Sequence, residues 1–88
     1  MLNWGLALRE RIEFVADRCI TDQIVDWFGK NISVVNSDEE HITVSLVASP
    51  MAMEHWAMQY INYVEIIKPT SLRERIKDNL KNATEKYK

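Results

Sequence analysis

Apolar and polar residues alternate along positions 8–16, near the start of the chain. A period of two is typical of a β-strand with one buried face. The pattern therefore predicts a strand over these residues, with Ile12 and Phe14 facing the core. Arg9 and Arg11 fall together on the opposite face of that strand.

The apolar spacing then changes to that of a helix. Thr21 is predicted as the N-cap of a short helix over about residues 22–28, and Gly29 is predicted as its left-handed C-terminal residue. Two β-branched runs follow, at 31–35 and 41–47, and the turn-forming residues 36–40 separate them. This arrangement predicts a β-hairpin.

A second helix is predicted to begin at Ser49-Pro50, with the serine as cap and the proline in the first helical position. Its apolar residues recur at i, i+3, i+4, i+7 and i+8, namely Met53, Trp56, Ala57, Tyr60 and Ile61.

Residues 64–67 form a short β-branched run that Pro69 ends, which predicts a last strand. Ser71-x-x-Glu74 has the spacing of a capping box, so a final helix is expected from Ser71. The apolar stripe of that helix comprises Leu72, Ile76, Leu80, Ala83 and Tyr87.

The predicted order is β-α-β-β-α-β followed by a helix. We therefore expect an α+β fold, a ferredoxin-like sandwich with a four-stranded antiparallel sheet and two helices on one face. Residues 8–88 would form this single domain, and residues 1–7 a linker or domain boundary. Trp27 and Trp56 lie on the apolar faces of the two helices, and both are expected in the core.

The other face of the sheet is also expected to carry apolar side chains. An exposed apolar face favours an interaction surface, so part of it is predicted to lie under the final helix and the rest to form an interface. The candidate interface residues are Val35, Val47, Tyr63 and Ile67.

Charge narrows the classes of partner. The net charge of −2 argues against general affinity for nucleic acid. The charge is uneven, since residues 1–70 carry five basic and ten acidic residues and residues 71–88 carry six basic and three acidic. A single cysteine, Cys19, and the absence of an apolar run of membrane-spanning length in the sequence favour a cytoplasmic protein that does not enter a membrane.

Candidate catalytic and metal-binding chemistry is sparse. His41, His55 and Cys19 fall on separate predicted elements without the close spacing of zinc ligands, so no metal site is expected. Two glycines cannot form a glycine-rich phosphate loop, and no cofactor or catalytic residue is expected. Arg9 and Arg11 are the candidate ligand-binding residues, for an anionic partner. The alternative is that they are an exposed pair that only adds solubility.

Two segments carry a family resemblance: Trp56-Ala-Met-Gln-Tyr60, and the stretch from Val64-Glu-Ile-Ile-Lys-Pro69 through Ser71-Leu-Arg-Glu74. With a closing helix that ends near Tyr87, they resemble the C-terminal extension, or WCX domain, of WYL-domain transcriptional regulators. Residues 12–15 and 26–29 fit the first strand and the first helix of that family, so the resemblance covers about residues 8–87.

The resemblance implies a non-catalytic regulatory domain of a bacterial transcriptional regulator. The parent chain would carry a helix-turn-helix or winged-helix domain and a WYL domain upstream, and these 88 residues would be a fragment of it. The domain would contribute to effector sensing, with a nucleic acid or nucleotide as effector, and to subunit contacts in a homodimer.

The sequence leaves two further function classes open. One is a free-standing small-molecule-binding domain of ACT-like type, because the same order of elements serves amino-acid sensing. The other is an enzyme with an acylphosphatase-like fold, which the missing phosphate loop disfavours.

Overall fold

The computed structural model describes residues 9–87, and the predicted linker 1–7 lies outside them. Four strands and three α-helices follow one another along the chain, with short 3₁₀ turns at Arg18–Ile20 and Gly29–Asn31 on either side of the first helix. In chain order the elements are β1 (Glu10–Asp17), α2 (Thr21–Phe28), β2 (Ser33–Ser37), β3 (His41–Ala48), α3 (Pro50–Gln59), β4 (Val64–Lys68) and α4 (Thr70–Lys86).

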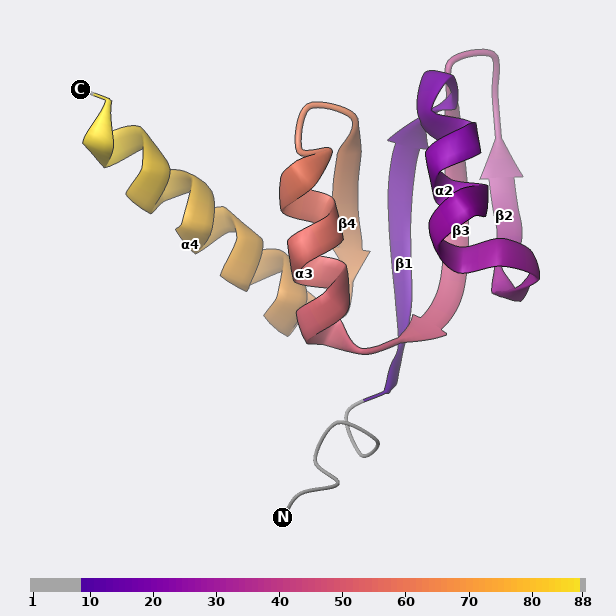
Figure 1. The fold of residues 1–88 in the computed structure, drawn as a ribbon, viewed down its shortest axis with the longest axis horizontal. Coiled ribbons are helices and arrows are strands. Elements are labelled where there is room, and N and C mark those ends of the chain that lie inside the picture. Colours follow the sequence, from indigo (N-terminus) through magenta and orange to yellow (C-terminus); the bar gives the residue numbers. More distant parts are fainter. Residues whose placement is uncertain (1–8, 88) are drawn as a thin grey trace.

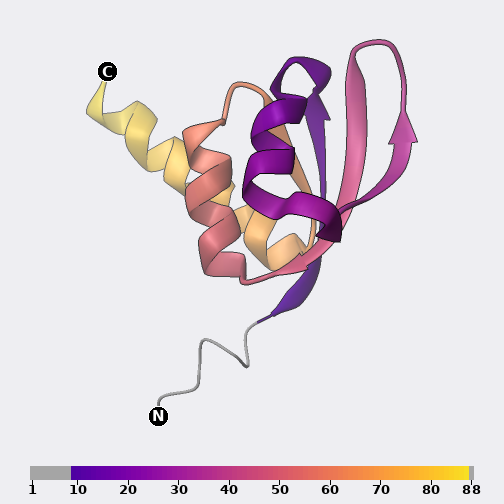
Figure 2. The ribbon, with the colours of Figure 1, turned by 45° about the vertical axis from the view of Figure 1, so that its right-hand side comes forward.

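The strands form one sheet in the order β2-β3-β1-β4, and every neighbouring pair is antiparallel. Helices α2 and α3 lie on the same face of this sheet, whereas the opposite face carries no helix (Figure 1; Figure 2). The prediction of an α+β fold with a four-stranded antiparallel sheet is confirmed. Each half of the chain contributes one central strand, one helix and one edge strand.

The core lies between the sheet and its helices. Alternate residues of β1 are buried, including Ile12 and Phe14, as their period of two predicts. Trp56 of α3 lies at the centre of an aromatic cluster, with ring centroids 5.4 Å from Phe14, 5.1 Å from Phe28 and 5.2 Å from Tyr60. Ile24 of α2 and Met53 of α3 complete the buried layer.

The expected position of Trp27 is wrong. Its side chain is 59% exposed, because the buried face of α2 is formed by Ile24 and by Phe28, which is partly buried. A helix of eight residues presents only a narrow stripe to the sheet, and two adjacent residues, 100° apart, cannot both face it. Phe28 contacts the core and Trp27 does not.

The final helix does not cover the open face of the sheet, contrary to expectation. Leu72 and Ile76 are buried in the same core as Trp56, so α4 extends the helical layer beside α3 and β4. From there its C-terminal half projects away from the rest of the domain (Figure 1). Leu80 is 39% exposed and Tyr87 almost fully exposed, so only the first half of the predicted apolar stripe is buried.

Three helix ends were predicted from side-chain caps, and one is confirmed. The Ser49 hydroxyl accepts a hydrogen bond from the backbone N–H of Ala52, and Pro50 occupies the first turn of α3. Thr21 is instead the first residue of α2, and its hydroxyl donates to the carbonyl of Arg18. The capping box at Ser71 is also wrong, since α4 begins at Thr70 without a side-chain cap.

Gly29 ends α2 with a φ of 62°, in the region that favours glycine. Its ψ of −135° lies outside the left-handed helical conformation that the sequence suggested. A Cβ at this position would have open space around it, so the backbone conformation and not crowding accounts for the glycine.

Candidate functional site

The open face of the sheet presents the two arginines that the sequence singled out. Arg11 lies opposite Val47 in the β1–β3 register, and its Nη1 donates to the Oγ of Ser45 on β3 at 3.0 Å. Arg9, just before β1, donates from Nη2 to the carbonyl oxygen of Val47 at 3.3 Å. Both guanidinium groups therefore lie against the same end of β3.

Neither arginine is neutralised within the part of the chain that the structure describes. Residues 9–87 contain four ion pairs, and Arg9 and Arg11 take part in none of them. A guanidinium group held by neutral oxygens keeps its charge and spare N–H donors for an anion. Two such groups, two residues apart on the same face of the strand, could together bind a phosphate or a carboxylate.

The four candidate interface residues do not gather in one patch. Val35 is on the edge strand β2, whereas Val47 is at the arginine end of β3. Tyr63 lies in the turn before β4, where its carbonyl accepts from the N–H of Asp17 at the far end of β1. Ile67 is half-buried beside the register shift in β4. Polar residues such as Glu13 separate them across the sheet, so the interface remains a prediction for separate positions.

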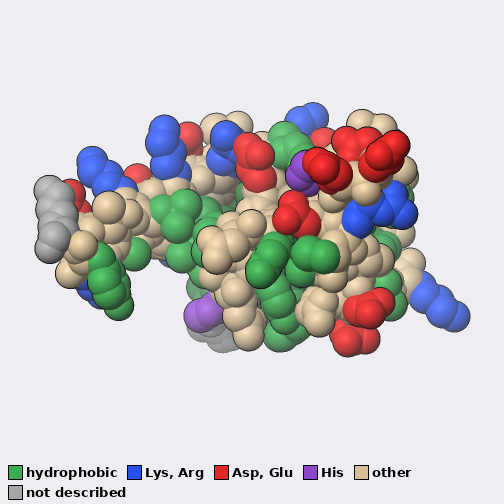
Figure 3. Space-filling view, turned by 90° about the horizontal axis from the view of Figure 1, so that it is seen from above, with side chains coloured by type: hydrophobic (Ala, Val, Ile, Leu, Met, Phe, Trp, Pro, Cys, Tyr) green, Lys and Arg blue, Asp and Glu red, His purple; other side chains and the backbone are tan. Residues whose placement is uncertain are grey.

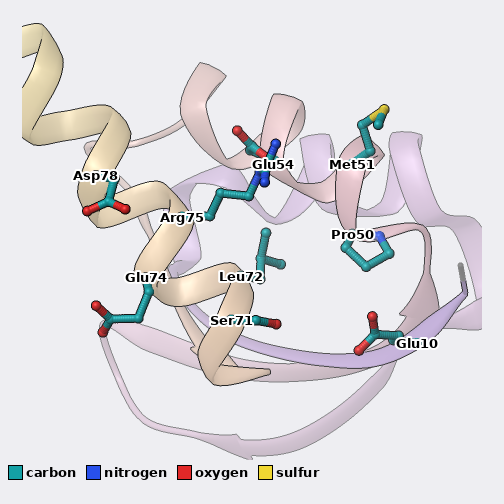
Figure 4. Close-up of a pocket in the computed structure, with 9 residues that line it drawn as sticks. All are labelled: Glu10, Pro50, Met51, Glu54, Ser71, Leu72, Glu74, Arg75 and Asp78. Atoms are coloured by element: carbon teal, nitrogen blue, oxygen red, sulfur yellow. The ribbon is translucent and has the colours of Figure 1, made fainter.

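A pocket of about 480 Å³ lies where α4 passes α3 and the start of β1 (Figure 4). Pro50, Met51 and Leu72 supply apolar surface, and Leu72 points into the hollow in the close-up. The charged residues that line it are Glu10, Glu54, Glu74, Asp78 and Arg75. Carboxylates predominate, so this pocket is unsuited to the anionic effector that the open face could bind.

Glu54 joins α3 to α4 at the border of this pocket. One carboxylate oxygen accepts from Arg75 Nε at 2.5 Å, and the other accepts from Asn79 Nδ2 at 2.7 Å. Burial raises the pKa of Glu54, but the hydrogen bonds from Asn79 and Arg75 outweigh it and leave the pKa below its usual value. The carboxylate stays ionised at neutral pH and fixes the helix pair.

The two histidines and the cysteine are not brought together as a metal site. Among the described residues, no group of three metal-binding side chains has suitable geometry. His41 lies between two carboxylates, with Nε2 at 3.3 Å from Asp17 and Nδ1 at 3.8 Å from Asp38. Asp38 accepts from the backbone N–H groups of Glu40 and His41, which lowers its pKa and orders the hairpin turn.

The balance of charge differs between the two parts of the molecule. Basic side chains follow the projecting half of α4, and acidic side chains gather over the body (Figure 3). Among residues 9–87, no helix is long and apolar enough to cross a membrane.

This geometry defines a small α+β domain with an open sheet face that carries two arginines without an ion pair among residues 9–87. The model of the WCX domain matches residues 7–84, and the chain belongs to that family. This confirms the resemblance to the C-terminal extension of WYL-type transcriptional regulators. No curated protein matches the chain.

Two exposed apolar side chains, those of Trp27 and Val34, were expected to be buried. With Val35, which was expected on the open face, they are among the most exposed large apolar residues of the described chain, and all three belong to α2 or β2. Trp27 was assigned to the core, and β-branched residues such as Val34 are typical of buried strands. A useful signal was the short length of the first helix, which leaves too little surface to cover an edge strand.

Proposed function

We propose that this chain is a non-catalytic regulatory domain at the C-terminal end of a cytoplasmic WYL-type transcriptional regulator. The match of the WCX model to residues 7–84 carries the proposal. We further propose that the domain is a ferredoxin-like sandwich, which the strand order and the two helices on one face support. The family supports a regulator over a free-standing ACT-like domain or an enzyme.

The gene that encodes this chain provides a direct test of which domains precede it. Reading the parent frame upstream of residue 1 should reveal a WYL domain, preceded by a winged-helix or helix-turn-helix domain. An open reading frame that begins at Met1, with neither module ahead of it, would overturn this part of the proposal.

Effector sensing is proposed for the open face of the sheet. The supporting observation is that Arg9 and Arg11 lie against one end of β3 without an ion pair in the described chain. A short single-stranded oligonucleotide or a nucleotide would bring its phosphates to these groups. Because each contact is charge-assisted, binding should weaken as salt increases.

Titration of the chain with a labelled single-stranded oligonucleotide tests this role. We expect Arg9→Gln and Arg11→Gln each to weaken binding by about tenfold and to flatten the salt dependence, since each removes a phosphate contact. Lys81→Gln, which removes a cation from the far part of α4, is the matched control and should have little effect. Binding that the two arginine variants do not alter would exclude the open face as the site.

Subunit contact is the second proposed role. The exposed apolar residues of α2 and β2, Trp27, Val34 and Val35, support it, because a group of such side chains on the surface is typical of an interaction site. Sedimentation of the chain over a range of concentrations measures association separately from effector binding. A chain that stays monomeric would remove subunit contact from the function of the isolated domain.

A further inference from the structure

The two edge strands of the sheet differ in how they are protected. Beside β4, Arg73 of α4 donates to the carbonyl oxygen of Ile66 at 2.8 Å and pairs with Glu65 at 2.8 Å. Strand β4 also ends in a lysine and is followed by Pro69. Helix cover, charge and proline are devices that prevent a sheet edge from pairing with another chain.

The outer edge of β2 lacks these devices within the described chain. Its five residues, Ser33 to Ser37, are all exposed and include no charged residue and no proline. In the sheet, β2 pairs only with β3, so its second side presents unpaired backbone groups. A bulge that makes Val35 the extra residue is the one feature that blunts this edge.

Apolar side chains lie beside the same edge. Val34 lies opposite the buried Val44 and so faces the helix side of the sheet, yet it is 57% exposed. Val35 is 58% exposed and Trp27 is 59% exposed.

The position of Trp27 follows from the neighbouring residues of α2. Phe28 points towards α3, because its ring lies 5.1 Å from that of Trp56, and Ile24 is fully buried. With 100° between successive residues, Trp27 lies beyond Ile24 on the flank of α2 away from α3. That flank faces the β2 side of the sheet (Figure 1).

The charges at the two ends of β2 are opposite in sign. Lys30 precedes the strand, and Asp38, Glu39 and Glu40 follow it. If two copies of β2 pair antiparallel, the end of each strand that follows Lys30 lies beside the acidic turn at the end of the other strand. Opposite charges then attract at both ends of the pair. A parallel pair would instead place the acidic turns side by side.

We propose that the β2 edge is a docking edge for a second copy of this chain, with the two β2 strands antiparallel. The two sheets then join into one, and Trp27 and Val34 of each copy pack across the seam on the helix side. Such an interface is self-complementary, as two-fold symmetry requires. The inference deepens the proposed subunit contact by naming its strand and the orientation of the two strands, and it assigns no role to Val47, Tyr63 or Ile67.

The strands are short, so the isolated chain should associate weakly. Pairing two five-residue edges buries less area than the roughly 1,000 Å² of a stable interface. The Trp27 indole of each copy adds to the buried area. We expect a reversible dimer with a dissociation constant in the micromolar-to-millimolar range. It should be weaker at high salt, because salt screens the attraction between Lys30 of one copy and the acidic turn of the other.

Sedimentation velocity of the 88-residue chain tests the edge. Trp27→Ser removes apolar area and Val34→Lys places a charge on the edge, and each should weaken dimerisation by about tenfold or more. Val25→Ser, on the other flank of α2, and Met51→Lys, on α3, change similarly exposed residues away from the edge and should leave the dimer unchanged. Thermal unfolding checks that each variant is folded.

Charge reversal tests the orientation of the two strands. Lys30→Glu and Glu40→Lys should each weaken the dimer, and the double variant should restore it. Failure of the double variant to recover affinity would overturn the antiparallel orientation of the two strands. A dimer that survives Val34→Lys would overturn the edge altogether, because another surface would then hold it.

Dimerisation through the β2 edge and effector binding at the two arginines can be tested independently. A chain that is monomeric at millimolar concentration but binds the oligonucleotide through Arg9 and Arg11 would overturn the edge and leave effector sensing intact. A dimer that Val34→Lys disrupts, in a chain that does not bind the oligonucleotide, would support the edge and overturn effector sensing at the two arginines.

Discussion

Phe28 and Trp56 meet edge to face, with ring centroids 5.1 Å apart and ring planes at 72°. Phe28 belongs to α2 and Trp56 to α3, so this contact joins the two strand–helix–strand halves of the domain above the sheet. Edge-to-face pairs add stability beyond the area they bury. The Trp56 indole N–H is buried without a hydrogen-bond partner in the described chain, so packing alone holds the ring.

The two tryptophans of the helices should respond very differently to substitution. Trp56→Leu should lower the free energy of unfolding by about 2–4 kcal/mol, because it leaves a cavity among Phe14, Phe28 and Tyr60. Trp27→Leu should change it by less than about 0.5 kcal/mol, since the side chain is mostly exposed. Urea denaturation followed by circular dichroism measures both. Equal losses at the two positions would contradict the packing described here.

The apolar stripe of α4 should divide into a stabilising half and a neutral half. Leu72→Ala removes a buried side chain and should cost about 2–4 kcal/mol. Leu80→Ala, eight residues further along the same stripe, should cost less than about 1 kcal/mol because that side chain is partly exposed. Urea denaturation of the two variants measures both effects. A large loss of stability in Leu80→Ala would show that the second half of α4 is also packed against the domain.

The link between α3 and α4 depends on Glu54. Glu54→Gln keeps the shape of the side chain but weakens its bonds to Arg75 and Asn79, and should destabilise the fold by about 1 kcal/mol. Arg75→Gln should have a similar effect, and the double variant should cost less than the sum of the two. Full additivity in this double-mutant cycle would mean that the pair contributes no coupling energy.

Acid should destabilise the domain through two carboxyl groups. Burial raises the pKa of Glu54, but hydrogen bonds from Asn79 and Arg75 lower it overall; backbone N–H groups lower that of Asp38. A carboxyl group with a lowered folded-state pKa stabilises the fold above its unfolded pKa, and this contribution is lost as the pH falls through the folded value. Stability should therefore fall below about pH 4. In urea denaturation at a series of pH values, the double variant Glu54→Gln and Asp38→Asn should lose less stability below about pH 4 than the unchanged chain does. An unchanged loss of stability in acid would mean that other groups cause it.

Local patterns predicted much of the fold. The period of two in β1, the turn residues between β2 and β3, and the Ser49-Pro50 start of α3 each depend on a few adjacent residues. Arg9 and Arg11 were placed on the open face by the same alternation. The predicted caps at Thr21 and Ser71 failed, because a capping side chain must compete with other local hydrogen bonds that spacing does not reveal.

The sequence by itself determined which segments are strands and helices, the buried face of β1 and the membership of the WCX family. Only the tertiary structure decided how far each helix covers the sheet. The same apolar spacing buries Trp56 and exposes Trp27, and it buries Leu72 and exposes Tyr87. Periodicity records which side of an element is apolar, whereas burial also requires a partner opposite it. The sheet and α3 provide that partner for the first half of α4, where Leu72 and Ile76 are buried, whereas Leu80 and Tyr87 in the second half are exposed.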